Sequence, residues 1–536
     1  MNMSSQLDSQ DWVKICKLDD ITPNTGVAAL VQGQQMAIFR VGDERRVYAL
    51  SNFDPFSQAN VMSRGILGDV QGERVVASPI YKQHFSLATG RCLEEQSQKL
   101  SVFPSKIENG EIWISPVAQK TYLPNNGQTI QRQKLILIGN GLAGMRCIED
   151  LLELASDRYE ISVIGAEPWG NYNRILLSPV LSGEKSVDEI MLHPHEWYQE
   201  KSIHFISNDP AKKIDRSKKR VETLNGQILE YDRLIIATGS LPFIPTIQGT
   251  DLEGVVSFRD LFDVEKMLAA TRTKQHAVVI GGGLLGLEAA YGLKQRGMQV
   301  SVVHLADRLM NRQLDFKASQ LLEEHLKALD INIYTDAATE ELLGKDGQVN
   351  QVKLKDGQIL TADLVVFATG IYPNTQLAKE AGLKCEKGIC VNDCMQTFDP
   401  SIYAVGECTE YRGQTFGLVE PLYAQAFVCA THLAEHGRLS FKIPAVPVKL
   451  KVSGCDVFSA GVIEPEGQYE DIIYDNPKAG IYKRIILQNE QIIGAVLFGD
   501  IEDGAWYAEL IENKQSVSEL KSDLLYGREF YLNKAS

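Results

Sequence analysis

Two glycine-rich segments, each between a strand-like run and a helix-like run, constrain this chain more than any other feature. The first is Gly139-Asn-Gly141-Leu-Ala-Gly144 after the apolar run 134–138, and the second is Gly281-Gly-Gly283-Leu-Leu-Gly286 after 277–280. In such a fingerprint the first glycine permits a tight turn, the second lets the backbone approach a pyrophosphate, and the third lets helix pack on strand. One fingerprint is weak evidence, but two predict two Rossmann-like α/β domains that bind two dinucleotides.

A pair of dinucleotide sites is typical of hydride transfer between a nicotinamide coenzyme and a flavin. The formal net charge of -15 argues against nucleic acid or an anionic membrane as a partner. The N-terminal residues lack the pattern of a signal peptide, and no run reaches the roughly 18 apolar residues of a membrane span. Nine scattered cysteines without a Cys-x-x-Cys pair favour a reducing compartment. We therefore expect a cytoplasmic protein.

Composition and turn signals predict a multidomain chain, as its 536 residues require. Residues 1–118 are β-rich, with short runs separated by glycine and proline, and 119–133 form a polar linker. Residues 134–436 alternate strand-like and helix-like runs, with the second dinucleotide-binding part at about 255–375. Residues 443–533 combine strand-like runs with a helical stretch, which predicts an α+β C-terminal domain.

Several residues near the first fingerprint are candidates for binding FAD. Glu167 ends the next strand-like run, where a carboxylate can accept hydrogen bonds from the ribose hydroxyls; a solvated loop acid is the alternative. Strand-like runs also end in the Ala-Thr-Gly turns at Thr238-Gly239 and Thr369-Gly370, and another ends at Gly406-Glu407.

This set of motifs resembles the pyridine nucleotide-disulphide oxidoreductase superfamily, which includes ferredoxin, rubredoxin and nitrite reductases. The resemblance implies that the Ala-Thr-Gly turns mark crossings between the FAD and NAD domains. It also implies that Glu407, where the family usually has Asp, hydrogen-bonds FAD, and that a helix starting near Glu420 directs its N-terminus at the flavin. Arg174 lies in the segment that runs beside the flavin, where it contacts FAD or makes a surface ion pair. Residues 176–182 hold no redox cysteine pair, so we expect electrons to leave the flavin directly.

The second fingerprint is followed by Glu288, which in relatives lies near the nicotinamide; a buried, paired helix acid is the alternative. The next strand-like run ends at His304, where NADH binders usually carry a carboxylate and NADPH binders place positive charge nearby. Asp307 and Arg308 follow, and the sequence leaves the choice open with NADH slightly favoured. No general acid, general base or metal ligand is predicted. The predicted cofactor-binding residues are Gly139, Gly141, Gly144, Glu167, Arg174, Thr238, Gly239, Gly281, Gly283, Gly286, Glu288, His304, Gly370, Gly406 and Glu407.

Residues 11–116 resemble the small subunit of assimilatory NAD(P)H nitrite reductase, which has a Rieske-like β fold. A Rieske centre needs Cys-x-His and Cys-x-x-His. The positions that match these ligands hold Asp54, Phe56, Ser78 and Tyr81, and His84 lies three residues too far along. The resemblance therefore implies the fold without its cluster, in a domain that docks a partner or shapes access to the flavin.

The region from residue 134 resembles the front part of the large subunit of the same enzyme. That subunit continues into cysteine-rich segments and a sirohaem domain, which this sequence does not contain, so we expect no reduction of nitrite by this chain alone. Cys385, Cys390, Cys394 and Cys408 miss a plant-type iron–sulfur spacing by one residue, and we interpret them as ordinary thiols rather than cluster ligands.

These inferences predict an FAD-dependent NAD(P)H oxidoreductase that transfers electrons to an assimilatory nitrate or nitrite reductase. One alternative is a rubredoxin- or ferredoxin-type reductase that supplies an oxygenase. A second is a regulatory or assembly subunit with a vestigial FAD site, and a third is an oxygen-reducing NADH oxidase.

Overall fold

The computed structural model describes residues 12–42, 47–70, 73–95, 98–118, 132–435, 439–443, 448–452 and 454–530, so most of the predicted linker lies outside it. The chain divides into two compact units. The first unit comprises residues 1–169, 195–238 and 375–442, and the second comprises 170–194, 239–374 and 443–536. Each unit is described by itself.

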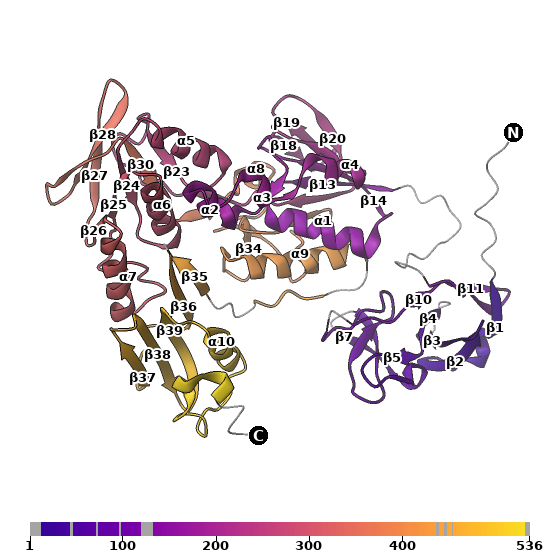
Figure 1. Cartoon of the computed structure of the whole chain (residues 1–536). Coiled ribbons are helices and arrows are strands. Elements are labelled where there is room, and N and C mark those ends of the chain that lie inside the picture. The colour runs from indigo at the N-terminus through magenta and orange to yellow at the C-terminus, as the bar shows by residue number, and fades with distance from the viewer. Residues whose placement is uncertain are drawn as a thin grey trace. The chain divides into compact units, whose positions relative to one another are not determined.

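The N-terminal part of the first unit is a β domain of short antiparallel strands (Figure 1, indigo). Alternate side chains of these strands, among them Phe39, Leu50 and Phe85, form its buried core. The predicted β-rich domain is thus present. Its sheets are β1 (Val13–Lys17), β12 (Glu111–Ile114) and β11 (Ser105–Glu108); β10 (Val102–Phe103), β4 (Val47–Ser51), β3 (Gln34–Arg40) and β2 (Thr25–Val31); β5 (Phe53–Asp54) and β6 (Ala59–Asn60); and β7 (Ile66–Val70), β8 (Glu73–Ala77) and β9 (His84–Ser86).

The first fingerprint belongs to a parallel five-stranded sheet in the same unit. Its order is β17 (His204–Ile206), β14 (Tyr159–Ile164), β13 (Gln133–Ile138), β21 (Arg233–Ile236) and β33 (Ile402–Ala404). Leu135 and Leu137 of β13 share a core with α1 (Leu142–Ala155) and α9 (Val419–Leu433), whereas Ile136 and Ile138 share a core with the antiparallel strands β18 (Ala211–Asp215), β19 (Arg220–Thr223) and β20 (Ile228–Glu230). Smaller elements are α4 (His195–Glu200), α8 (Gln376–Glu380), β32 (Ile389–Cys390) and β34 (Thr409–Glu410).

The second fingerprint belongs to a parallel sheet in the second unit. Its order is β23 (Val255–Ser257), β30 (Leu364–Phe367), β24 (His276–Ile280), β25 (Gln299–Val303) and β26 (Ile331–Tyr334). Helices α5 (Leu261–Thr271), α6 (Leu284–Gln295) and α7 (Phe316–Ala328) accompany it, with the antiparallel strands β27 (Thr339–Lys345), β28 (Gln348–Leu354) and β29 (Ile359–Thr361). The remaining elements are β15 (Asn171–Tyr172), α2 (Leu177–Ser182), α3 (Val187–Ile190), β16 (Met191–His193), β22 (Ser240–Pro242) and β31 (Ile371–Pro373).

The C-terminal part of the second unit is an antiparallel sheet with one covering helix (Figure 1, yellow). Its order is β35 (Val448–Val452), β36 (Cys455–Gly461), β39 (Gln491–Phe498), β38 (Ile481–Gln488) and β37 (Glu470–Asn476). Helix α10 (Gly504–Glu512) buries Trp506 and Tyr507 in the core of this sheet. The predicted α+β domain is therefore present. Within the described ranges, no helix has the length and apolar character that crossing a membrane requires.

Candidate functional site

The first fingerprint is a cradle with one open position. Gly139 has a φ of +105°, and a Cβ on it would lie 2.1 Å from the Ala237 carbonyl oxygen. A Cβ on Gly144 would lie 2.9 Å from the Gly139 carbonyl oxygen. Gly141 differs, because its φ of -90° suits any residue and no atom lies within 4 Å of an added Cβ. It precedes α1, whose N-terminus has no side-chain cap.

The second fingerprint repeats this geometry in the other unit. Gly281 has a φ of +125°, and its Cβ would lie 2.3 Å from the Ala368 carbonyl oxygen, while a Cβ on Gly286 would lie 1.9 Å from the Gly281 carbonyl oxygen. Gly283 again has ordinary angles, open space around an added Cβ, and no side-chain cap on the helix it precedes.

Neither backbone conformation nor protein packing requires glycine at Gly141 or Gly283. What glycine preserves there is room above an uncapped helix N-terminus, where free N–H groups and the helix dipole favour an anion. The residues present therefore fit the pyrophosphate of a dinucleotide in each unit.

Each cradle is closed by an Ala-Thr-Gly turn, which supplies the alanine carbonyl opposite the first glycine. Gly239 and Gly370 in these turns have φ values of +66° and +112°, and Thr369 Oγ1 donates a hydrogen bond to the Phe243 carbonyl. The first turn contains the boundary between the two units, after Thr238, and the second turn ends shortly before the boundary at Asn374.

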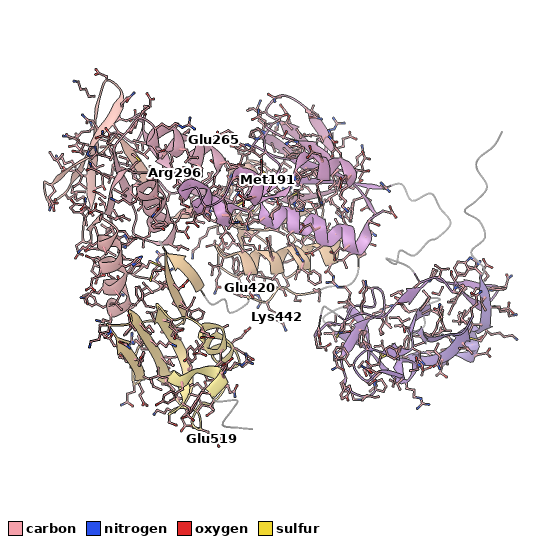
Figure 2. All side chains as sticks on the ribbon, viewed as in Figure 1. Met191, Glu265, Arg296, Glu420, Lys442 and Glu519 are labelled. Carbon is pink, nitrogen blue, oxygen red and sulfur yellow. The ribbon has the colours of Figure 1, made fainter. Side chains whose placement is uncertain are left out.

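Among the other predicted flavin-side residues, Glu167 and Glu407 are half-buried, three residues beyond the ends of β14 and β33. Gly406 has a φ of +92°, and its N–H donates to Gln425 Oε1 at 2.8 Å. Gln425 is fully buried on α9. No role was predicted for it from the sequence, although a polar amide within an otherwise apolar helical run could have indicated one. Helix α9 begins at Val419, close to the predicted start, and Glu420 in its first turn is labelled in Figure 2.

Arg174 lies in the second unit. Its guanidinium donates to the Arg259 carbonyl at 3.3 Å and lies 4.9 Å from the centroid of the Tyr172 ring. Its contact with FAD stays a prediction.

Glu288 on α6 forms a pair with Ser178 on α2, a residue that the sequence did not single out. The Ser178 hydroxyl donates to Glu288 Oε2 at 2.5 Å. Burial raises the pKa of Glu288, which the Ser178 hydrogen bond only partly offsets. Arg296, labelled in Figure 2, joins the same two helices because its guanidinium donates to the carbonyls of Leu181 and Val180 at 2.7 and 3.2 Å.

His304 lies at the end of β25, beside the second cradle. The Gly282 N–H donates to its Nδ1 at 3.0 Å, so the proton of the neutral ring is on Nε2. Burial lowers the pKa of His304, which favours this uncharged form. The guanidinium of the nearby Arg308 forms ion pairs with Asp307 and Glu464.

None of the four cysteines near an iron–sulfur spacing forms a disulfide. Cys408 Sγ donates to the carbonyls of Val405 and Ile236, and Cys394 Sγ donates to the Leu439 carbonyl. Over the described parts of the chain, no group of three or more His, Cys, Asp or Glu residues is arranged to hold a metal ion.

The positions that match Rieske ligands carry a hydrogen-bonded polar cluster. Asp54 and Ser78 are fully buried, and the Ser78 hydroxyl donates to Asp54 Oδ2 at 2.7 Å. The Ser57 hydroxyl donates to the same oxygen at 2.8 Å, while Tyr81 is exposed. A carboxylate, a hydroxyl and two aromatic rings do not fit a [2Fe–2S] cluster that needs thiolates and imidazoles.

Comparison with known proteins identifies the family. Residues 133–426, more than half of the chain, match the model of the pyridine nucleotide-disulphide oxidoreductases. The chain belongs to this family. Residues 11–115 match the Rieske-like [2Fe-2S] domain, and residues 447–515 match the rubredoxin NAD+ reductase C-terminal domain. The predicted superfamily, Rieske-like domain and Rossmann-like sheets are confirmed. The protein is an NAD(P)H-dependent oxidoreductase, and its family implies that it binds FAD and NAD(P)H.

Two relatives of this oxidoreductase come from Bacillus subtilis (strain 168). A nitrite reductase [NAD(P)H] is 47% identical over 388 residues, which are 72% of this chain and 48% of the relative. An assimilatory nitrate reductase electron transfer subunit is 41% identical over 397 residues, which are 74% of this chain and 51% of the relative. The chain thus spans about half the length of each. The solved structure of an NAD-dependent persulfide reductase from A. fulgidus matches with a TM-score of 0.67 and 28% identity, over 73% of this chain and 78% of that one.

Proposed function

We propose that this oxidoreductase is the electron-transfer component of an assimilatory nitrate or nitrite reductase. The observation that carries the proposal is the pair of open glycine cradles, one in each unit, in a chain whose relatives include an electron transfer subunit of nitrate reductase. When bound, FAD accepts a hydride from the nicotinamide and releases electrons one at a time, which suits an acceptor with a metal centre.

The first cradle, in the dinucleotide region from about residue 134 to 436, binds FAD. Gly141 admits the pyrophosphate to the N-terminus of α1, and Glu167 accepts hydrogen bonds from the adenosine ribose. Glu407 contacts the remainder of the cofactor. The bond from the Gly406 N–H to Gln425 fixes the turn that carries Glu407.

The second cradle, within residues of about 255–375, binds the pyridine nucleotide, with Gly283 at the pyrophosphate and Glu288 towards the nicotinamide. NADH is the preferred donor. NADPH binding needs a positive charge near the ribose phosphate. Burial lowers the pKa of His304, which disfavours its charged form, and the Arg308 guanidinium is already paired with two carboxylates.

The clusterless Rieske-like domain docks the acceptor or shapes access to the flavin, and the protein works in the cytoplasm. None of the nine cysteines forms a disulfide, which supports this location because disulfides persist mainly in oxidising compartments. The acceptor is a redox protein rather than a nucleic acid or a membrane, in keeping with the net charge of -15.

The test is anaerobic stopped-flow mixing of the FAD-loaded protein with NADH and with NADPH, followed by addition of purified candidate acceptors. We expect NADH to bleach the visible flavin band, and nitrate or nitrite reductase to restore it. Deletion of the gene separates the two acceptors. Lost growth on nitrate with growth on nitrite points to nitrate reductase, and loss on both points to nitrite reductase. A purified protein without a flavin spectrum would contradict the proposal.

The match of residues 447–515 to the rubredoxin NAD+ reductase C-terminal domain favours a second candidate, a rubredoxin-type reductase that supplies an oxygenase. Faster reoxidation of the flavin by rubredoxin than by nitrate or nitrite reductase in the same assay would establish it instead.

A further inference from the structure

The loop of residues 304–315 joins β25 to α7. It hydrogen-bonds both the N–H and the carbonyl of Gly282, the residue between Gly281 and Gly283 in the second fingerprint. The Gly282 N–H donates to His304 Nδ1 at 3.0 Å, and the Met310 N–H donates to the Gly282 carbonyl at 2.9 Å. A Cβ on Gly282 would lie 2.7 Å from His304 Cγ and 2.7 Å from Leu309 Cδ2. The conformation of the 304–315 loop therefore fixes the cradle that receives the pyridine nucleotide.

The other end of the 304–315 loop is held by the C-terminal domain through the buried carboxylate of Asp315. The Tyr482 hydroxyl donates to Asp315 Oδ2 at 2.7 Å, and Arg484 Nη1 donates to the same oxygen at 3.3 Å. Both donors lie on β38, two residues apart and hence on one face of the sheet. Asp315 Oδ1 accepts from the Ala318 N–H at 2.9 Å and so caps α7, which lies beside the C-terminal sheet in Figure 1.

These donors are themselves rigidly placed. The Arg484 guanidinium binds both carboxylate oxygens of Asp471 at 3.0 Å and donates to the Ile463 carbonyl at 3.2 Å. Tyr482 is only 3% exposed. A second contact joins the middle of the loop to the same domain, where Arg308 pairs with Glu464. Charge-assisted bonds to a buried carboxylate are among the stronger polar contacts in proteins, so the C-terminal domain limits the conformations of the loop.

We infer that the C-terminal domain acts as a clamp for pyridine-nucleotide binding, with Tyr482, Arg484 and Asp315 as positioning residues that act through the 304–315 loop. The inference rests on the proposed function, because it requires the second cradle to be the coenzyme site. If the loop holds the binding-competent conformation in only a fraction of the molecules, the apparent Kd equals the intrinsic Kd divided by that fraction. The clamp therefore lowers the Kd for the coenzyme without contacting the reacting atoms.

The test compares Tyr482→Phe with Tyr507→Phe in the full-length, FAD-loaded protein. Tyr507 is a matched control because its buried hydroxyl donates to the Leu524 carbonyl at 2.6 Å within the same domain. The dependence of the flavin-bleaching rate on NADH concentration gives the Kd and the limiting rate separately. We expect Tyr482→Phe to raise the Kd about three- to tenfold with an unchanged limiting rate and FAD content, and Tyr507→Phe to leave the Kd unchanged.

Asp315→Asn provides a second variant, since asparagine still caps α7 but lacks the charge. We expect it to raise the Kd as well, and the double variant with Tyr482→Phe to add little, because both changes remove the same interaction. Equal Kd values in wild type, Tyr482→Phe and Asp315→Asn would overturn the clamp while leaving the coenzyme site intact. If neither NADH nor NADPH bleaches the wild type, the proposed function fails first and the clamp falls with it.

Discussion

Gly283→Ala tests the coenzyme cradle because the structure separates its cost in folding from its cost in binding. Gly283 has φ and ψ of -85° and 179°, which alanine adopts without strain, and no atom lies within 4 Å of the added Cβ. Alanine is a poorer N-cap than glycine, which destabilises the folded variant by about 0.5 kcal/mol. Alanine also lowers the conformational entropy of the unfolded chain, which stabilises the folded variant by about 0.4–1 kcal/mol. We therefore expect the free energy of unfolding to change by less than about 1 kcal/mol.

Binding responds differently, because the methyl group occupies the space through which the pyrophosphate reaches the N-terminus of α6. A hydrogen bond to a charged group contributes about 1.5–3 kcal/mol, so losing one or two raises the Kd for NADH about 10- to 10⁴-fold. Anaerobic stopped-flow bleaching measures this Kd, while the visible spectrum checks that FAD remains bound. Gly141→Ala is the reciprocal control and should lose FAD from a folded protein.

Gly286→Ala is the control for packing. Its Cβ would lie 1.9 Å from the Gly281 carbonyl oxygen, so this variant should lower the thermal unfolding midpoint strongly. A Gly283→Ala protein that binds NADH as tightly as wild type would refute the reasoning, since the open space would then have no ligand to admit. If Gly283→Ala lowered the unfolding midpoint as much as Gly286→Ala, the claim that an added Cβ at Gly283 meets open space would be refuted.

Three further changes test other contacts. Ser178→Ala removes the donor to Glu288, so the pKa of that carboxyl should rise further. Because the proposed site places Glu288 towards the nicotinamide, the pH profile of flavin reduction by NADH should shift to higher pH by about one to two pH units; an unchanged pH profile of the bleaching rate would contradict this. Burial raises the pKa of Asp150 from 3.8 to about 6, so its protonated form stabilises the fold at low pH and that contribution is lost as the pH rises through about 6. Denaturant titrations at about pH 4 and pH 7 measure this change. Between these pH values the free energy of unfolding of wild type should fall by about 1–2 kcal/mol more than that of Asp150→Asn, a value that includes a reduction for solvent screening. Asp54→Ala leaves the buried Ser78 hydroxyl without its acceptor and should cost about 1–3 kcal/mol in the unfolding of the N-terminal domain, with the flavin spectrum unchanged; equal stability of the variant would contradict the role of this pair.

The sequence predicted the parts of the fold that depend on neighbours along the chain. The first glycine of each fingerprint has the positive φ that the motif requires, and each third glycine packs on the turn just before it. The apolar runs became the central strands because a buried parallel strand needs side chains that are apolar on both faces. These features depend on residues that are close together in the chain, so the sequence alone is enough to predict them.

Contacts between distant residues could not be predicted in this way. Ser178 meets Glu288 across 110 positions, and Tyr482 meets Asp315 across 167. Each of these side chains has an ordinary polar character that equally suits a solvated surface. The Ala-Thr-Gly turns were visible as turns, but their closure of the two cradles follows only from the order of strands in each sheet.

The middle position of the two fingerprints shows how duplicated motifs become different sites. In the first, Asn140 uses its side chain, which accepts from the Tyr198 hydroxyl at 2.6 Å. In the second, Gly282 uses only its backbone, because His304 and Leu309 approach within 2.7 Å of where a Cβ would be. The Tyr198 hydroxyl on α4 thus holds the first cradle, whereas the second cradle is held by a loop whose conformation depends on the C-terminal domain. A cofactor held permanently suits the first arrangement, and a coenzyme that must bind and leave in every turnover suits the second.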